Sequence, residues 1–139
     1  MIIDHVGIAV RAIAPAVAQW ETLFGYRQAT EIVTNTRQQV RVAFLEKPGS
    51  LPVKLIEPTD AASPIFAFCQ RGGGLHHLCF RAASVSAETA RLRALGVRVL
   101  SEPQPGEAFE NEPIAFVYAA GLNVELVDTE RRAGRLPPP

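Results

Sequence analysis

The sequence is short of the residues that would build a disulfide-linked scaffold or a zinc finger. It contains only two cysteines, Cys69 and Cys79, and they do not form the C-x-x-C spacing of a zinc motif. Small secreted domains that depend on disulfides carry several cysteine pairs. Two cysteines are too few for such a framework, so the fold must rest on a hydrophobic core.

The sequence also lacks an excess of either charge and any long apolar run. Lys and Arg together number 14, as do Asp and Glu, so no global field favours nucleic acid or an anionic membrane. No apolar stretch approaches the ~20 residues that a membrane-spanning helix requires. No basic region followed by an apolar stretch and a cleavage site marks a secretion signal. We expect a cytoplasmic protein that binds neither nucleic acid nor membranes.

What the sequence does contain is a repeat of itself. The segment DHVGIAV, with His5, is echoed by HHLCFRA, with His77, and VKLIEPT, with Lys54, is echoed by VELVDTE, with Glu125. The last two residues each follow a helix-ending glycine by 29 residues (25 to 54 and 96 to 125). Conserved order and spacing of this kind indicate internal duplication. Repeat-mates tend to meet near the axis that relates the halves, so we expect these four side chains to converge.

Each copy of the repeat is predicted to fold as β-α-β-β-β. Alternating segments rich in β-branched residues indicate strands, and an apolar stripe at helical spacing indicates one helix per copy. Gly25 is the expected stop of the first helix and Ser86 the expected N-cap of the second. The helices are expected over 14–24 and 87–95, and the strands over 3–10, 27–33, 39–47, 52–58, 74–82, 97–103, 114–120 and 123–129.

The chain is long enough for one domain with a substantial core. We expect a single α+β domain over residues 1–130, with modules over about 1–58 and 74–130 related by pseudo-two-fold symmetry. Residues 59–73 would link the modules. The tail, residues 131–139, is Pro-rich and basic, and we expect it to be disordered.

The repeat register decides which histidine of the second copy is the mate of His5. Because H-L-C-F overlays H-V-G-I, the mate is His77, and strand alternation would then turn His76 outward. Taken alone, either histidine could be a structural or surface residue. Glu125 lies in an apolar strand, where a buried carboxylate needs a partner or a metal, unless it occupies the exposed face of an edge strand. Two histidines and one carboxylate suit zinc or ferrous iron.

These features resemble the vicinal-oxygen-chelate superfamily. The resemblance rests on the paired modules, on DHVGIAV, on SPI ahead of GGGLHHLCF and on the closing VELVD, and it covers residues 3–128. It implies a cup-shaped, eight-stranded mixed sheet. In such a cup, four strands each supply one ligand to a divalent metal (zinc, cobalt, manganese, nickel or iron), here His5, His77, Glu125 and the residue at Lys54. GLHHLCF and SPIFAF give the closest likeness to methylmalonyl-CoA epimerases, with glyoxalase I more distant; members are often homodimers.

At Lys54 the sequence departs from that family, which has Gln or Glu there. A unit charge ~4 Å from another costs about 4 kcal/mol at an effective dielectric of 20, and a divalent ion doubles this. Three outcomes are open. The other three residues could hold a metal alone; the ammonium of Lys54 could take the place of the metal and pair with Glu125; or a lysine with a lowered pKa could act as a base or as a clamp on a carbonyl.

Two functions follow from these observations. The resemblance implies enolate chemistry on a small acyl thioester, such as an acyl-CoA, or a related carbonyl compound, with Glu125 and Lys54 as catalytic residues. The alternative is a metal-free small-molecule-binding protein, or a divergent enzyme of the same fold. The alternative is favoured by Lys54 and by the absence of the family's proton-transferring Glu near Arg37.

Three further side chains are candidates for substrate binding. Arg37 and Arg81 could meet a phosphate or a carboxylate, although solvated arginines are commoner. Cys79 shares a strand face with His77 and is expected to face the cavity, although a buried cysteine usually serves only as a small apolar side chain.

Overall fold

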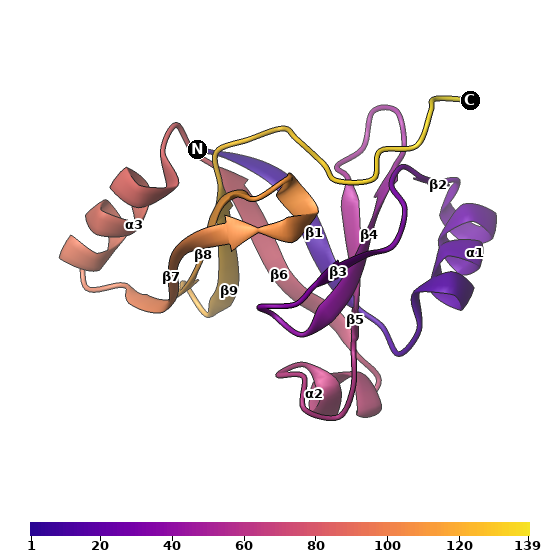
Figure 1. Cartoon of the computed structure of the whole chain (residues 1–139), viewed down its shortest axis with the longest axis horizontal. Helices are drawn as coiled ribbons and strands as arrows, with labels where there is room; N and C mark the ends of the chain where they lie inside the picture. Colours follow the sequence, from indigo (N-terminus) through magenta and orange to yellow (C-terminus); the bar gives the residue numbers. More distant parts are fainter.

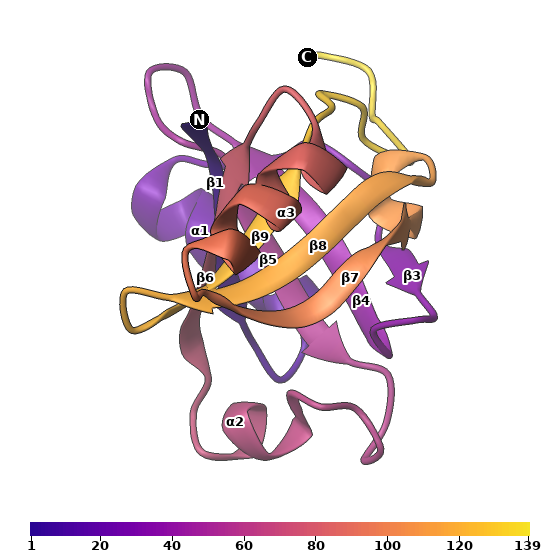
Figure 2. The same cartoon turned by 90° about the vertical axis from the view of Figure 1, so that its left-hand side faces the viewer.

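The computed structural model describes residues 1–139, which form one mixed β-sheet with the helices Ile13–Phe24 and Val85–Ala94 on its outer side and the helix Phe66–Gln70 at one end (Figures 1 and 2). The order of its strands is β2-β4-β5-β1-β6-β9-β8-β7, and β3 also pairs with β4. The strands are β1 (Ile2–Ala9), β2 (Arg27–Gln28), β3 (Val33–Asn35), β4 (Val40–Glu46), β5 (Val53–Pro58), β6 (Gly74–Arg81), β7 (Arg98–Gly106), β8 (Glu112–Ala119) and β9 (Leu122–Val127). The helices are α1 (Ile13–Phe24), α2 (Phe66–Gln70), α3 (Val85–Ala94) and the 3-10 helix η1 (Glu107–Phe109).

The strand order is symmetric about the central pair of strands. β1 and β6 run antiparallel at the middle of the sheet. Each is flanked by a parallel strand of its own module, β5 beside β1 and β9 beside β6. The next strands outward, β4 and β8, are antiparallel to those. The predicted α+β mixed sheet is confirmed, and its symmetry places β1, β5, β6 and β9, which carry the four repeat-mates, side by side.

The observed limits of the helices agree closely with the predicted ones except at the N-terminus of α3. α1 ends as predicted at Gly25, whose left-handed backbone (φ 72°) lets its N–H bond the carbonyl of Glu21. The predicted N-cap of α3, Ser86, is wrong. The cap is Ser84, which has extended backbone dihedrals and accepts a hydrogen bond from the N–H of Ala87. α1 packs against β2, β4 and β5, and α3 packs against β7 and β8 (Figure 2).

The tail, residues 131–139, lies along the domain in the structure. It crosses from the second module to the first (Figure 1). There, the N–H of Glu31 bonds the carbonyl of Gly134, and the N–H of Leu136 bonds that of Ala29. The predicted strand over 27–33 is divided into β2 and β3, whose registers against β4 differ by two residues, and Thr30 between them pairs with Arg135. Composition alone does not reveal backbone pairing across such a separation.

Two β-bulges interrupt the central β1–β6 pair, one on each strand. The extra residue on β1 is Asp4, which immediately precedes His5. The extra residue on β6 is His76, which immediately precedes His77. A bulge breaks the strict alternation of side chains. The residue before each predicted site histidine is therefore free to lie beside it rather than on the opposite face.

Three apolar clusters hold the fold together. The largest joins the two modules and includes Phe44 from β4 and Phe109 from η1. The second packs α1 against the first module through Ile13, and the third packs α3 against the second module through Val85. No helix in the structure combines the length and apolar character that a membrane crossing would require.

Candidate active site

The structure brings the four repeat-mates, His5, Lys54, His77 and Glu125, together in the interior of the protein. Lys54 Nζ lies 3.2 Å from Glu125 Oε2 and 3.3 Å from Oε1. His5 Nε2 lies 3.0 Å and His77 Nε2 lies 3.2 Å from the same Oε1. All four side chains are buried. The central strands thus deliver two imidazoles and one ammonium group to a single carboxylate.

The carboxyl group of Glu125 is charged in this setting. Complete burial on its own would raise the pKa of Glu125. The adjacent Lys54 ammonium and the hydrogen bond from His5 reverse this effect and hold the pKa well below its usual value. A buried carboxylate with these partners keeps its negative charge, so Glu125 fixes the lysine by an ion pair.

The ring of His77 is neutral and leaves one nitrogen without a hydrogen-bond partner. Burial lowers the pKa of His77 to about 4. Its Nδ1 lies 2.9 Å from Nδ1 of His76. Its Nε2 is close to Glu125, but the geometry does not make a hydrogen bond, and this buried atom has no other partner. An unpartnered buried nitrogen is costly, which marks it as a candidate contact for a ligand.

The other imidazole, His5, lies between two carboxylates. Its Nδ1 is 2.7 Å from Asp4 Oδ2, and its Nε2 faces Glu125. Burial would raise the pKa of Asp4, but the hydrogen bond with His5 and the charge of Arg132 keep it lowered. Because both acids are charged, both contacts are hydrogen bonds only when both ring nitrogens carry protons.

Three residues near the histidines were not predicted from the sequence to belong to the site. Asp4 and Arg132 had no assigned role, and His76 was predicted to point outward, which is wrong. The bulges place Asp4 and His76 beside the histidines that follow them. The only sign of these two residues in the sequence is that a polar residue precedes each site histidine. Arg132 lies in the tail, whose composition predicts disorder and gives no signal of a site residue.

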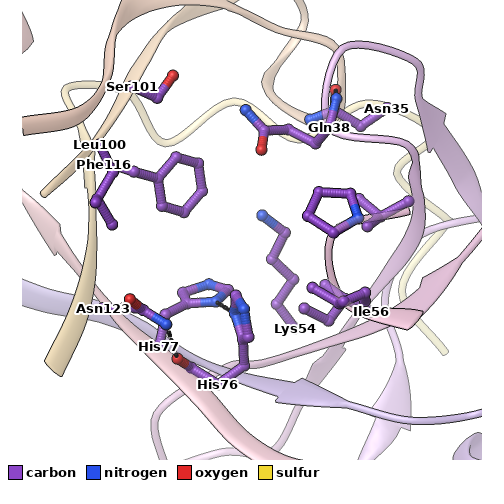
Figure 3. Close-up of a pocket in the computed structure, with 13 residues that line it drawn as sticks. Asn35, Gln38, Lys54, Ile56, His76, His77, Leu100, Ser101, Phe116 and Asn123 are labelled. Atoms are coloured by element: carbon purple, nitrogen blue, oxygen red, sulfur yellow. Dashed lines mark hydrogen bonds between the residues drawn. The ribbon is translucent and has the colours of Figure 1, made fainter. Parts of the chain in front are cut away.

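A cavity of about 260 Å³ opens beside this cluster (Figure 3). The Nζ of Lys54 points into it, with His76 and His77 on one side and Gln38 above. Glu125, which contacts Lys54, and His5, which contacts Glu125, do not line the cavity. The residues that line it are Asn35, Gln38, Val40, Lys54, Ile56, Pro64, Ile65, His76, His77, Leu100, Ser101, Phe116 and Asn123. Its wall is therefore apolar and amide-rich, with one side chain of full positive charge.

The three residues predicted to bind substrate do not line this cavity. Cys79 is fully buried in the core that joins the modules, opposite His5 in the strand register. Arg81 pairs with Glu130 and approaches Asp4 at the far end of β6. Arg37 is half exposed and lies near Glu107. The shared strand face was predicted correctly, but the cavity lies only at the His77 end of it.

A small residue on β1 makes room for the second histidine, and its replacement gives a test. A Cβ atom at Gly7 would lie 2.1 Å from Cε1 of the His77 ring. We expect Gly7→Ala to lower the free energy of unfolding by about 1–3 kcal/mol, because the ring must move within a packed interior. Urea denaturation measures the change.

The matched control for this substitution is a His77→Ala background, in which the obstructing ring is absent. There, Gly7→Ala should cost much less than in the unmodified protein. Equal costs in the two backgrounds would show that the ring is not what the added methyl group meets.

Comparison with protein families identifies a superfamily that matches this chain. A model of the glyoxalase/bleomycin resistance protein/dioxygenase superfamily matches residues 4–116, most of the chain and three of the four site strands. The chain belongs to this superfamily. The resemblance drawn from the sequence motifs is therefore confirmed.

Several similar members of the superfamily are epimerases. An ethylmalonyl-CoA/methylmalonyl-CoA epimerase from Cereibacter sphaeroides is 29% identical over 131 residues, 93% of this chain and 96% of that relative. The crystal structure of methylmalonyl-CoA epimerase from Mycobacterium tuberculosis shares 35% identity with a TM-score of 0.81, over 91% of this chain and 86% of the other. A methylmalonyl-CoA epimerase in complex with methylmalonyl-CoA and NH4+ shares 30% identity with a TM-score of 0.81, over 97% of each chain. These relatives support an epimerase-like function on an acyl-CoA.

The donor atoms of the site suit a divalent ion, whereas Lys54 does not. The ligand atoms of His5, His77 and Glu125 lie within 4.8 Å of one another. An ion bound there through the carboxylate would have the Lys54 ammonium as its neighbour, since Nζ contacts both oxygens. The repulsion is about 8 kcal/mol at 4 Å and an effective dielectric of 20. With this lysine charged, the four residues of this superfamily member do not fit a divalent metal.

Proposed function

We propose that this protein is an epimerase-like enzyme that forms the enolate of a small acyl-CoA thioester and uses the Lys54 ammonium where its relatives would use a metal. The observation that carries the proposal is the position of Nζ. It points into the cavity (Figure 3) and forms an ion pair with Glu125, which does not line the cavity. The similarity to epimerases of acyl-CoA substrates supports the choice of substrate class.

Lys54 would act by electrostatic stabilisation. Removal of the proton next to a thioester leaves negative charge on the thioester oxygen. A fixed cation in a water-poor cavity stabilises such charge far more than solvent does. The ion pair with Glu125 orients the ammonium before substrate arrives. In this proposal Lys54 acts as an electrostatic clamp on the thioester oxygen, and Glu125 orients the Lys54 ammonium.

The proton acceptor is to be sought among the imidazoles. Glu125 does not line the cavity, and Gln38, which does, cannot take a proton at neutral pH. His76 and His77 line the cavity and share a contact between their Nδ1 atoms. Burial lowers the pKa of His76, so its ring is neutral at pH 7 and able to accept a proton.

One similar epimerase structure contains a monovalent nitrogen cation together with the substrate. That methylmalonyl-CoA epimerase is in complex with methylmalonyl-CoA and NH4+. In the present chain the ammonium of Lys54 would supply such a cation as part of the protein. The position of Nζ against both oxygens of Glu125 is consistent with a cation held permanently in the site.

A second candidate function is binding without turnover. It is favoured by the cavity wall, which carries no carboxylate to serve as acid or base. A site of this composition could hold a small acyl compound through Lys54 and the amides without enolising it. The expected homodimer and cytoplasmic location stay predictions under either function, as does the identity of any metal.

Deuterium exchange at C2 of methylmalonyl-CoA tests the proposal. We expect the protein to exchange this proton in D2O above the background rate, and Lys54→Met to reduce the exchange about 100- to 1,000-fold through loss of the charge. Lys47→Met is the matched control, because Lys47 is an exposed lysine that bonds only the carbonyl of Phe24. Background exchange by the unmodified protein, with tight calorimetric binding of the thioester, would instead support the binding function.

A further inference from the structure

The tail contributes one side chain to the interior of the protein. Arg132 is 8% exposed, although it lies in a Pro-rich, basic segment. Its guanidinium stacks over the rings of Phe44 and Phe109, at 4.5 Å and 4.9 Å from their centroids. Lys54 Nζ lies 5.0 Å from the same Phe109 centroid. A buried arginine between aromatic rings is favourable only when its charge also has a partner.

The partner of Arg132 is Asp4, the bulge residue of β1. Arg132 Nη2 donates to Asp4 Oδ2 at 2.5 Å, and that same oxygen lies 2.7 Å from Nδ1 of His5. His5 in turn contacts Glu125, which holds Lys54. An unbroken series of polar contacts therefore runs from the tail to the ammonium that faces the cavity.

Asp4 has no equally close alternative partner among the cations. Arg81 Nη1 is 3.7 Å from the other oxygen of Asp4 and also bonds the exposed Glu130. Without Arg132, the buried Asp4 would keep only this weaker contact and its bond to His5. A carboxylate that orients a site imidazole must itself be held in place, because otherwise its direction is free to change.

We propose that Arg132 is a positioning residue of the candidate active site and that it acts through Asp4 to fix the ring of His5 against Glu125. The tail is then part of the site rather than an appendage to the domain. The orientation of His5 follows from the contacts alone. The consequence for catalysis rests on the proposed function.

The experiment compares Arg132→Met and Arg132→Lys with the unmodified protein by two readouts. The first is the ¹H–¹⁵N spectrum of the histidine rings, which is simple because the chain has three histidines; His5→Gln assigns the signals of His5. The second is C2 deuterium exchange of methylmalonyl-CoA, analysed as kcat and KM. We expect Arg132→Met to shift the His5 ring signals and to lower kcat about 10- to 100-fold with little change in KM. Arg132→Lys should restore part of both.

Arg135→Met is the matched control within the same segment. Arg135 pairs with Glu46 at the surface, and its loss should change neither readout. Unchanged His5 signals in Arg132→Met, or equal changes in Arg135→Met, would overturn the proposal. If Arg132→Met does not fold, Asp4→Asn takes its place, and the ¹H–¹⁵N signals of the His5 ring must then move in that variant. If the unmodified protein shows no exchange, the proposed function fails and the ring signals alone decide the positioning role.

Discussion

Lys54→Gln is expected to turn the candidate active site into one that binds a divalent metal stoichiometrically. The substitution removes the ammonium that contacts both oxygens of Glu125 and supplies an amide oxygen in its place. His5, His77 and Glu125 already present their ligand atoms within 4.8 Å of one another. Removal of a repulsion of about 8 kcal/mol, partly relieved by movement of the lysine, should raise metal affinity at least about 1,000-fold.

Metal content of protein purified without chelators, followed by zinc titration, measures this effect. Lys54→Met separates the two contributions of the substitution, because it removes the charge without adding an oxygen. It should bind metal more tightly than the unmodified protein and less tightly than Lys54→Gln. Stoichiometric metal in the unmodified protein would contradict the idea that the ammonium takes the place of the metal.

Glu125→Gln is expected to be the most destabilising single substitution in the site. Glu125 is fully buried and is the only carboxylate that contacts Lys54. Its neutralisation leaves a buried ammonium without a counter-ion and leaves a single amide oxygen to accept from both Lys54 and His5. Loss of one partner from a buried ion pair typically costs about 3–5 kcal/mol. Urea denaturation at neutral pH should show a loss of this size in the free energy of unfolding.

Two variants make this prediction specific. Glu57→Gln removes a partly exposed carboxylate, which pairs with Arg41 at 3.4 Å, and should cost less than about 1 kcal/mol. The double variant Lys54→Met with Glu125→Leu removes both charges and should recover most of the stability. A cost below about 1 kcal/mol for Glu125→Gln would mean that water reaches the lysine and screens its charge.

The repeat pattern in the sequence predicted the convergence of four side chains, and the resemblance to a known superfamily implied the mixed sheet. The repeat paired His5 with His77 and Lys54 with Glu125, and the strand order about β1 and β6 brings these mates together. Strand and helix periodicity placed most elements within a few residues of their observed limits. These predictions succeeded because each rests on a pattern that is local or repeated.

The rest of the site could not be predicted because it depends on departures from regular structure. Strict alternation turns Asp4 and His76 away from the histidines that follow them, and only the bulges bring them back. Alternation also placed Cys79 and Arg81 on the correct face without showing where along that face the cavity opens. Arg132 lies in a segment whose composition is typical of disorder, and its contacts are with residues far away in the sequence.

The contact between Arg132 and Asp4 has a consequence for the order in which the protein is made. Ribosomes release the chain from its amino end, so β1 emerges long before its antiparallel neighbour β6. Asp4 then waits for a counter-ion that follows it by 128 residues. Until Arg132 is made, Asp4 has only its bond to His5 and the longer contact with Arg81. A chain halted before Arg132 would therefore lack the closest ion-pair partner of this buried carboxylate.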